Sequence, residues 1–204
     1  GLIKLFSKFN ITPRFQIMKH CGLGKTNSKY IPSPYEKKKI IDEINNKAIK
    51  HDLKVNNSIR FQPFLDNNEL NDGNCNLKKY HRCRAYTYSI GISPYGYVLP
   101  CEFLEPYKEF WDINILEKNI MDIWHNSNMA NKFRYIPIEG KCAKCSFNNI
   151  CEMGCLAETY ALTKNLNSSD PTCWYNNKNY KSLPKDNQYI LGNVRKESDL
   201  IYGN

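Results

Sequence analysis

Cysteine is the residue type whose number and spacing in this sequence could do chemistry. The chain has nine cysteines, and eight of them lie in the stretch from residue 75 to residue 173. Thiolates bind zinc and iron-sulfur clusters, because these metals are thiophilic and take a nearly tetrahedral set of ligands. In a chain without a secretory signal, clustered cysteines more often bind metal or do redox chemistry than form disulfides. The clustered residues are Cys75, Cys83, Cys101, Cys142, Cys145, Cys151, Cys155 and Cys173.

The densest run of thiols is Cys142-x2-Cys145-x5-Cys151-x3-Cys155. On a continuous helix, Cys151 and Cys155 would share one face, which groups the four cysteines of the run around one zinc ion. Eight cysteines also suffice for two complete four-thiolate sites, and that arrangement gives Cys173 a partner. The spacing leaves both arrangements open.

A β-hairpin and short helices are expected to position these cysteines. Residues 89–92 and 97–99 flank Ser93-Pro94-Tyr95-Gly96, whose proline and glycine supply turn geometry. The hairpin would end at Cys101. Helices are predicted over residues 119–125, 127–133 and 151–164.

The region before the cysteines predicts a strand, a helix and a second strand. Residues 14–18 are typical of a short buried strand, followed by a glycine-rich turn. Ser33 is a suitable N-cap, and Pro34 suits the first turn of a helix that runs to about His51. The second strand covers residues 59–64. This order predicts one right-handed parallel βαβ unit.

The cysteine pattern resembles the seven-cysteine signature of the SPASM domain, the C-terminal extension of many radical S-adenosylmethionine enzymes. The hairpin ending in Pro100-Cys101 and the helix containing Trp124 also resemble that domain. The departures are mild: for example, Arg84-Ala85 stands where the family often has Ala-Gly. The signature residues here are Cys83, Gly96, Cys101, Cys142, Cys145, Cys151, Cys155 and Cys173.

The resemblance implies two auxiliary 4Fe-4S clusters with crossed ligand sets. By analogy with two-cluster members of the family, the first cluster would be held by Cys75, Cys83, Cys101 and Cys155. The second would be held by Cys142, Cys145, Cys151 and Cys173. Cys75 lies upstream of the signature, and some members of the family lack this ligand.

The region before residue 66 also resembles the family, in the late strands of its catalytic barrel. Residues 14–18 with the following Gly22-Leu23-Gly24-Lys25-Thr26-Asn27 resemble one strand and its loop, and Phe61-Gln62-Pro63-Phe64 resembles the next strand. In the family these strand ends approach the nucleoside of S-adenosylmethionine, which makes Gln62 and Pro63 candidate cofactor-binding residues. Ordinary buried strands and a glycine turn would explain any single one of these residues equally well.

The sequence contains no C-x3-C-x2-C triplet. Radical S-adenosylmethionine chemistry needs this triplet to hold a further 4Fe-4S cluster, whose open iron chelates the methionine part of the cofactor. The chain also begins with Gly1 rather than Met. We therefore expect a fragment that lacks the N-terminal half of the barrel and is inactive alone, whereas the complete enzyme would contain S-adenosylmethionine and the third cluster. The remaining thiol, Cys21, is interpreted as a buried structural residue.

The expected fold class is an α/β remnant of a partial (β/α) barrel followed by a small α+β iron-sulfur domain. Residues 1–66 would form the barrel part and residues 74–176 the SPASM domain. Residues 177–204 would form a polar C-terminal tail. The boundary is placed between residues 66 and 74, where the composition changes to Asn, Asp and Gly.

Charge and hydropathy limit the classes of partner that the chain is expected to bind. Lys and Arg number 29 against 20 Asp and Glu, which gives a net charge of +9. Because this charge is scattered along the chain, the sequence favours a solvated basic surface over a nucleic-acid groove. The sequence has no apolar run long enough for a membrane span and no signal-peptide pattern at its start, so a cytoplasmic protein without a membrane segment is expected.

The expected function is modification of a peptide or protein substrate by a radical S-adenosylmethionine enzyme, with auxiliary clusters that transfer electrons or bind substrate. Glu102, next to Cys101, is a candidate base, because some sulfatase-maturating relatives carry a carboxylate at that position. A surface glutamate is the simpler interpretation. A function of another class stays open, namely a zinc-binding interaction module with two four-cysteine sites and a basic surface.

Overall fold

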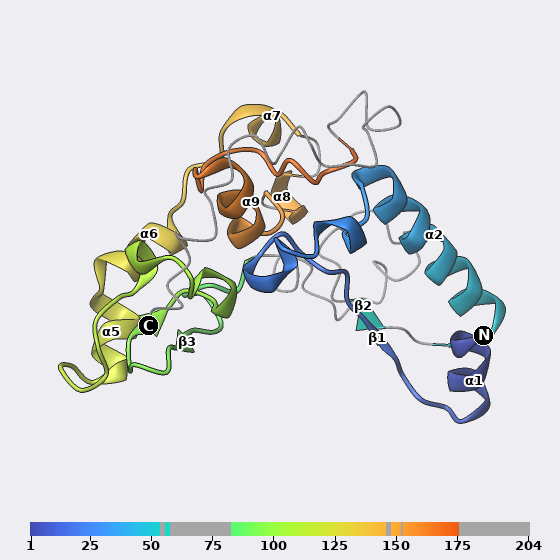
Figure 1. Cartoon of the computed structure of the whole chain (residues 1–204), viewed down its shortest axis with the longest axis horizontal. Coiled ribbons are helices and arrows are strands. Elements are labelled where there is room, and N and C mark those ends of the chain that lie inside the picture. The colour runs from blue at the N-terminus through green and yellow to red at the C-terminus, as the bar shows by residue number, and fades with distance from the viewer. Residues whose placement is uncertain (54–55, 58–82, 146–147, 152, 176–204) are drawn as a thin grey trace.

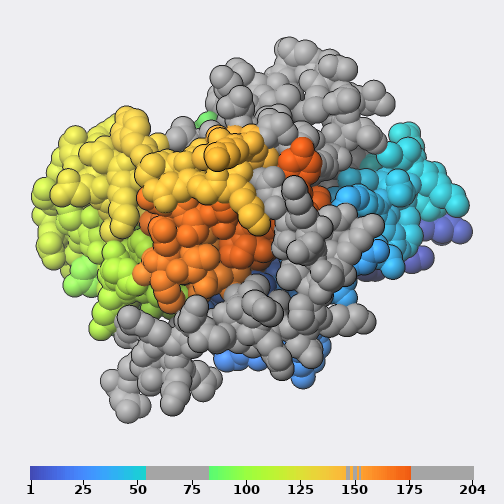
Figure 2. Space-filling model, turned by 90° about the horizontal axis from the view of Figure 1, so that it is seen from above, coloured from blue at the N-terminus to red at the C-terminus, as the bar shows by residue number. Residues whose placement is uncertain are grey.

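The computed structural model describes residues 1–53, 56–57, 83–145, 148–151 and 153–175. Helices α1 (Leu2–Lys8) and α2 (Pro34–Lys50) lie at one end of the molecule, and a β-hairpin with two short helices lies at the other (Figure 1). The helices that follow residue 139 lie between these ends. Seen from above, the segment from α9 onward, coloured orange, lies between the yellow helices and the cyan α2 (Figure 2).

Helix α2 begins where the sequence predicts. The Ser33 Oγ accepts a hydrogen bond from the backbone N–H of Glu36 at 3.3 Å, and the backbone N–H of Ser33 donates to the Glu36 carboxylate at 3.0 Å. This reciprocal capping box satisfies two N–H groups that the first turn cannot pair. The helix buries Ile41 and Ala48 and has its C-cap at His51, as predicted.

A parallel pair of strands is connected across α2, but its second strand covers residues 56–57 and precedes the predicted residues 59–64. Strand β1 (Arg14–Phe15) pairs in parallel with β2 (Asn56–Asn57), with Arg14 opposite Asn56. The pairing therefore covers two residues of the strand predicted over residues 14–18. The strand predicted over residues 59–64 lies outside the described residues. Between β1 and α2 the chain forms two single 3₁₀ turns, η1 (Gly22–Gly24) and η2 (Ser28–Tyr30).

The predicted hairpin is confirmed. Strand β3 (Gly91–Ile92) pairs antiparallel with β4 (Val98–Leu99). Gly96 in the turn has φ +85°, and a Cβ built there would lie 2.8 Å from Oδ1 of Asn114. The turn thus requires glycine for both its backbone angle and its space. Two 3₁₀ turns follow the hairpin, η4 (Glu102–Leu104) and η5 (Lys108–Phe110).

Short helices complete the cysteine region. The first two match the prediction and begin at the side-chain N-caps Asn119 and Ser127. The single helix predicted over residues 151–164 is wrong: Met153 and Gly154 have φ of 67° and 72°, and these left-handed residues interrupt the helix. The helices are α5 (Ile120–Asn126), α6 (Asn128–Arg134), α7 (Gly140–Ala143), α8 (Asn148–Cys151) and α9 (Leu156–Thr163).

The larger apolar core joins the hairpin to α5, α6 and α9. Several of its aromatic rings pack edge to face, and the Phe110 and Tyr160 centroids lie 4.6 Å apart at an angle of 88°. A second, smaller core pairs Ile41 of α2 with Trp174, and Cys151 and Cys173 pack against it. The end of the cysteine region is therefore held against α2. Among the helices of the described residues, none combines the length and the apolar character that crossing a membrane requires.

Candidate metal centre

One group of thiols forms around Cys101, at the end of the hairpin. Burial raises the pKa of the Cys101 thiol to about 12, and negative charges on Glu102, Cys155 and Cys83 contribute, against a lowering hydrogen bond from the backbone of Phe103. Cys155 also belongs to the larger apolar core, and Cys83 packs against that core, although the three residues are far apart in the sequence. We name Cys83, Cys101 and Cys155 the hairpin thiol group.

A second group forms around Cys151, at the end of α8. Burial raises the pKa of the Cys151 thiol to about 12, with contributions from the charges of Cys173, Asp170 and Cys142 and a lowering hydrogen bond from the backbone of Gly154. We name Cys142, Cys151 and Cys173 the C-terminal thiol group.

Two backbone contacts position the loop that carries the C-terminal thiol group. The backbone N–H of Cys142 donates to the Ser169 hydroxyl at 3.0 Å, which ties α7 to the segment before Cys173. Cys145 lies in the turn between α7 and α8, where its N–H donates to the carbonyl of Cys142 at 3.1 Å. Cys145 is therefore next to this group in the fold as well as in the sequence.

Cys151 and Cys155 do not share a helix face. Helix α8 ends at Cys151, and α9 has Cys155 as its N-cap, with the left-handed Met153 and Gly154 between them. The premise that would group these two cysteines on one zinc ion is therefore wrong. Cys155 belongs to the larger apolar core, against which Cys83 packs, whereas Cys151 packs with Cys173 against the smaller core.

The donor set has the chemistry that iron-sulfur clusters require. All eight cysteines in the described residues are free thiols, and Cys142 and Cys155 are buried. Within the described residues, no three Cys, His, Asp or Glu side chains are placed to hold one metal ion. A 4Fe-4S cluster separates its thiolates more widely than a single zinc ion does. The two thiol groups thus fit clusters of this kind by type and by apolar surroundings.

The structure describes one of the other predicted site residues and leaves three outside its described ranges. Glu102 is exposed at the start of η4, and the Cys101 thiol donates to its Oε2 at 3.4 Å. The candidate base is thus adjacent to the hairpin thiol group. Cys75, Gln62 and Pro63 lie outside the described residues.

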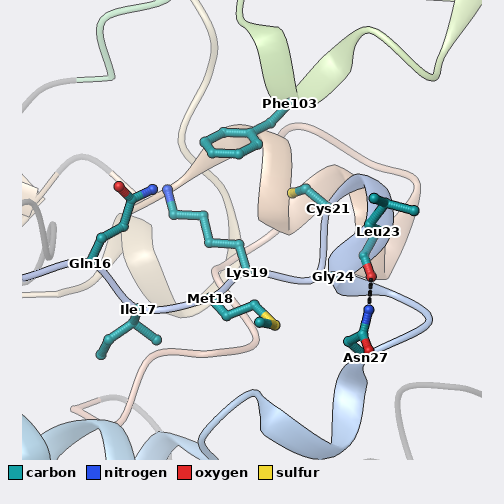
Figure 3. A pocket seen from close by; sticks show the side chains of 9 residues that line it. All are labelled: Gln16, Ile17, Met18, Lys19, Cys21, Leu23, Gly24, Asn27 and Phe103. Carbon is teal, nitrogen blue, oxygen red and sulfur yellow. Dashed lines mark hydrogen bonds between the residues drawn. The ribbon is translucent and has the colours of Figure 1, made fainter.

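A pocket of about 430 Å³ lies next to Cys21 (Figure 3). It is formed by the segment after β1, which the sequence singled out for its glycine-rich loop, and by one aromatic ring from η4. Asn27 closes one side, where its Nδ2 donates to the carbonyl of Leu23 at 3.1 Å. The lining residues are Gln16, Ile17, Met18, Lys19, Cys21, Leu23, Gly24, Asn27 and Phe103.

Two pocket residues connect the pocket to the hairpin thiol group. The Lys19 Nζ donates to Sγ of Cys155 at 3.2 Å and lies 5.0 Å from the centroid of the Phe103 ring. Cys21 is buried, as the sequence suggested, and burial followed by the charges of Cys155 and Glu158 raises the pKa of its thiol far above the ordinary value. Sequence reasoning missed Lys19, because its contact with Cys155 spans 136 residues and no local pattern marks it.

Buried polar groups join the segment before α2 to the end of the cysteine region. Nδ1 of His20 lies 3.1 Å from Oε1 of Glu158 in α9. The buried Lys37 of α2 donates to the hydroxyl of Thr172 at 3.2 Å, and that hydroxyl donates to Oδ1 of Asp170 at 2.8 Å. These contacts fix the N-terminal region against both thiol groups.

Comparison with known proteins identifies the cysteine region. Residues 83–146 match the family model of SPASM, an iron-sulfur cluster-binding domain. The PqqA peptide cyclase of Methylocella silvestris is 34% identical over 88 residues, which are 42% of this chain and 23% of that protein. The PqqA peptide cyclase of Gluconobacter oxydans is 28% identical over 116 residues, or 55% of this chain and 31% of that protein. The chain spans about a quarter of the length of the first of these relatives.

Solved structures show the same fold over most of the chain. Streptococcus suis SuiB bound to its precursor peptide SuiA matches with a TM-score of 0.57 at 19% identity, covering 85% of this chain and 40% of SuiB. SuiB bound to S-adenosylmethionine matches with a TM-score of 0.53 at 18% identity, covering 85% of this chain and 41% of SuiB. With the SPASM match, these findings confirm the predicted resemblance to the C-terminal part of a radical S-adenosylmethionine enzyme.

Proposed function

We propose that this chain, which carries a SPASM domain and resembles the C-terminal part of radical S-adenosylmethionine enzymes, is the cluster-bearing part of an enzyme that modifies a peptide or protein. The relatives support the substrate class, because two are named peptide cyclases and the SuiB structure holds a precursor peptide. The observation that carries the proposal is where the thiols pack: Cys155 belongs to the larger apolar core and Cys83 packs against it, whereas Cys151 and Cys173 pack against the smaller one.

Each thiol group would hold one 4Fe-4S cluster. The hairpin thiol group supplies three ligands, and Cys75 is proposed as the fourth. The C-terminal thiol group supplies three ligands, with Cys145 as the fourth. This crossed assignment is supported by the break between Cys151, which ends α8, and Cys155, which caps α9.

The N-terminal region would be the last part of a partial barrel, over residues 1–66, followed by the SPASM domain over residues 74–176 and a polar tail over residues 177–204. The parallel pairing of β1 with β2 across α2 supports this proposal. The first half of the barrel, with its own cluster, would correspond to the additional length of the relatives, of which the match covers 23% in the Methylocella silvestris protein. The thiol-rich composition fits the reducing cytoplasm.

S-adenosylmethionine would lie at the barrel strand ends, with Gln62 and Pro63 toward its nucleoside. The pocket after β1 supports this placement, because it is built from the loop that the barrel resemblance singles out. Phe103 closes the pocket from the side of the SPASM domain (Figure 3). The substrate peptide would therefore approach between the two regions.

Clusters in the two thiol groups, when bound, supply one-electron transfer away from the modified peptide. The side chains around them would orient the peptide and accept its proton. Glu102 is proposed to take that proton at Oε2, the oxygen that now accepts the Cys101 thiol hydrogen bond at 3.4 Å. Its exposed position at the start of η4 leaves the carboxylate accessible to a bound peptide.

Metal analysis of the anaerobically purified chain, reconstituted with iron and sulfide, tests the proposal. We expect a brown protein with about eight irons, the content of two 4Fe-4S clusters. Cys145→Ala should lose about four irons. Cys21→Ala is the matched control, because Cys21 belongs to the same apolar core as Cys155 but is assigned to neither cluster. A colourless protein that binds zinc, or an equal loss in Cys21→Ala, would overturn the proposal.

A further inference from the structure

Lys19 is a cation in direct contact with a proposed cluster ligand. Its Nζ donates a hydrogen bond to Sγ of Cys155 at 3.2 Å. The same Nζ lies 5.0 Å from the centroid of the Phe103 ring, at a distance typical of a cation–π contact. Figure 3 shows the lysine side chain extended across the pocket toward that ring.

These two contacts place the ammonium group between two elements that carry ligands. Phe103 lies in η4, which follows Cys101 directly, and Cys155 is the N-cap of α9. The lysine itself comes from the segment after β1, in the other region of the chain. The contact therefore crosses from the proposed barrel part to the proposed cluster.

A positive charge at this sulfur has a definite electrostatic effect. Reduction of a cluster adds one negative charge, and an adjacent ammonium stabilises the reduced state more than the oxidised state. Hydrogen bonds to the sulfurs are among the factors that set the reduction potentials of iron-sulfur clusters. The Glu102 carboxylate, 3.4 Å from Sγ of Cys101, acts in the opposite direction on the same group.

We propose that Lys19 raises the reduction potential of the cluster held by Cys155, through its hydrogen bond to the Cys155 sulfur. This inference rests on the proposed function, since it requires a cluster in the hairpin thiol group. It assigns to the proposed barrel part a direct role in the electron affinity of the SPASM domain.

The test is a redox titration of the reconstituted chain, followed by electron paramagnetic resonance of the reduced clusters. In Lys19→Met we expect one of the two transitions to move to lower potential. A tenfold smaller ratio of reduced to oxidised cluster at a fixed potential would correspond to about 59 mV for a one-electron couple. Lys19→Arg keeps a charged hydrogen-bond donor, so its reduction potential should lie close to that of the wild-type chain.

Lys132→Met is the matched control. Lys132 is exposed on α6, and its Nζ lies 5.5 Å from the centroid of the Phe110 ring, so the control removes the same charge and one cation–π contact. Both transitions should stay unchanged in this variant. Equal potentials in Lys19→Met and Lys132→Met would overturn the inference while leaving the clusters, and the proposed function, intact.

Iron content separates the remaining outcomes. A loss of about four irons in Lys19→Met would mean that the lysine holds Cys155 in place instead of tuning its cluster, which contradicts the inference. A wild-type chain without iron would overturn the proposed function, and this inference with it.

Discussion

Nδ1 of His20 lies 3.1 Å from Oε1 of Glu158, and the backbone N–H of His20 donates to the same oxygen at 3.3 Å. The pair is buried, with side chains that are 6% and 4% exposed. It joins the segment before α2 to α9, the helix that begins directly after Cys155. The position of Cys155, a proposed cluster ligand, relative to the pocket therefore depends on one buried carboxylate.

Glu158→Gln should lower the free energy of unfolding by about 1.5–3 kcal/mol, because it weakens a buried charge-assisted hydrogen bond. Urea unfolding of the purified chain measures this. Glu43→Gln is the control, since Glu43 forms an exposed pair with Lys47 within α2 and its loss should leave stability within error. Equal stability of Glu158→Gln and the wild-type chain would show that the buried pair contributes nothing net.

The same carboxylate gives stability a defined pH dependence. Burial acts to raise the pKa of Glu158, but the hydrogen bond from His20 and the charges of Lys37 and Lys19 outweigh it and hold the pKa below its ordinary value of 4.5. The ionised carboxylate therefore stabilises the fold fully above pH 4.5, and this contribution is lost as pH falls through the lower folded pKa. The stability difference between wild type and Glu158→Gln should shrink in urea titrations below pH 4.5. A constant difference would contradict the assignment.

Single and double cysteine variants test whether Cys151 and Cys155 serve different clusters. Each single alanine variant should lose about four irons, and the double variant about eight. The losses add because the two residues would belong to separate sites. Iron and sulfide assays on the reconstituted proteins measure this. A double variant that loses no more iron than either single one would place both cysteines on one cluster.

Gly96→Ala should destabilise the hairpin by about 1–2 kcal/mol or more, since it places a side chain at a positive φ and against Asn114. Gly91→Ala in β3 is the matched control, because the Cβ added there has its nearest neighbour at 3.6 Å. Thermal unfolding of the two variants compares them. Equal midpoints of thermal unfolding for the two variants would show that the turn does not depend on glycine.

Local signals in the sequence were sufficient for the elements that have caps and turns. Ser33 and Pro34 marked the start of α2. The glycine of the turn predicted that β3 and β4 form a hairpin. The proposed grouping of the cysteines is non-local, and only the family resemblance predicted it. The helix predicted through Cys151 failed because Met153, which is not a residue that usually takes positive φ, has a left-handed backbone here.

Long-range contacts were outside the reach of the sequence. Lys19 lies in an ordinary polar-apolar stretch, and its role depends on Cys155 and Phe103, which meet it only in the folded chain. The same holds for His20 and Glu158. Periodicity and spacing report neighbours along one element, whereas these pairs are set by how the two regions pack together.

The contact between α2 and the end of the cysteine region also has a consequence for biosynthesis. Lys37 reaches Thr172 across 135 residues of sequence, and Ile41 packs on Trp174. Because a ribosome releases the chain from its N-terminus, α2 leaves the exit tunnel long before its buried face meets these partners. Contacts of such sequence separation also slow folding. Chaperone binding to nascent chains should therefore centre on the apolar face of α2 and end once the segment around Trp174 has emerged.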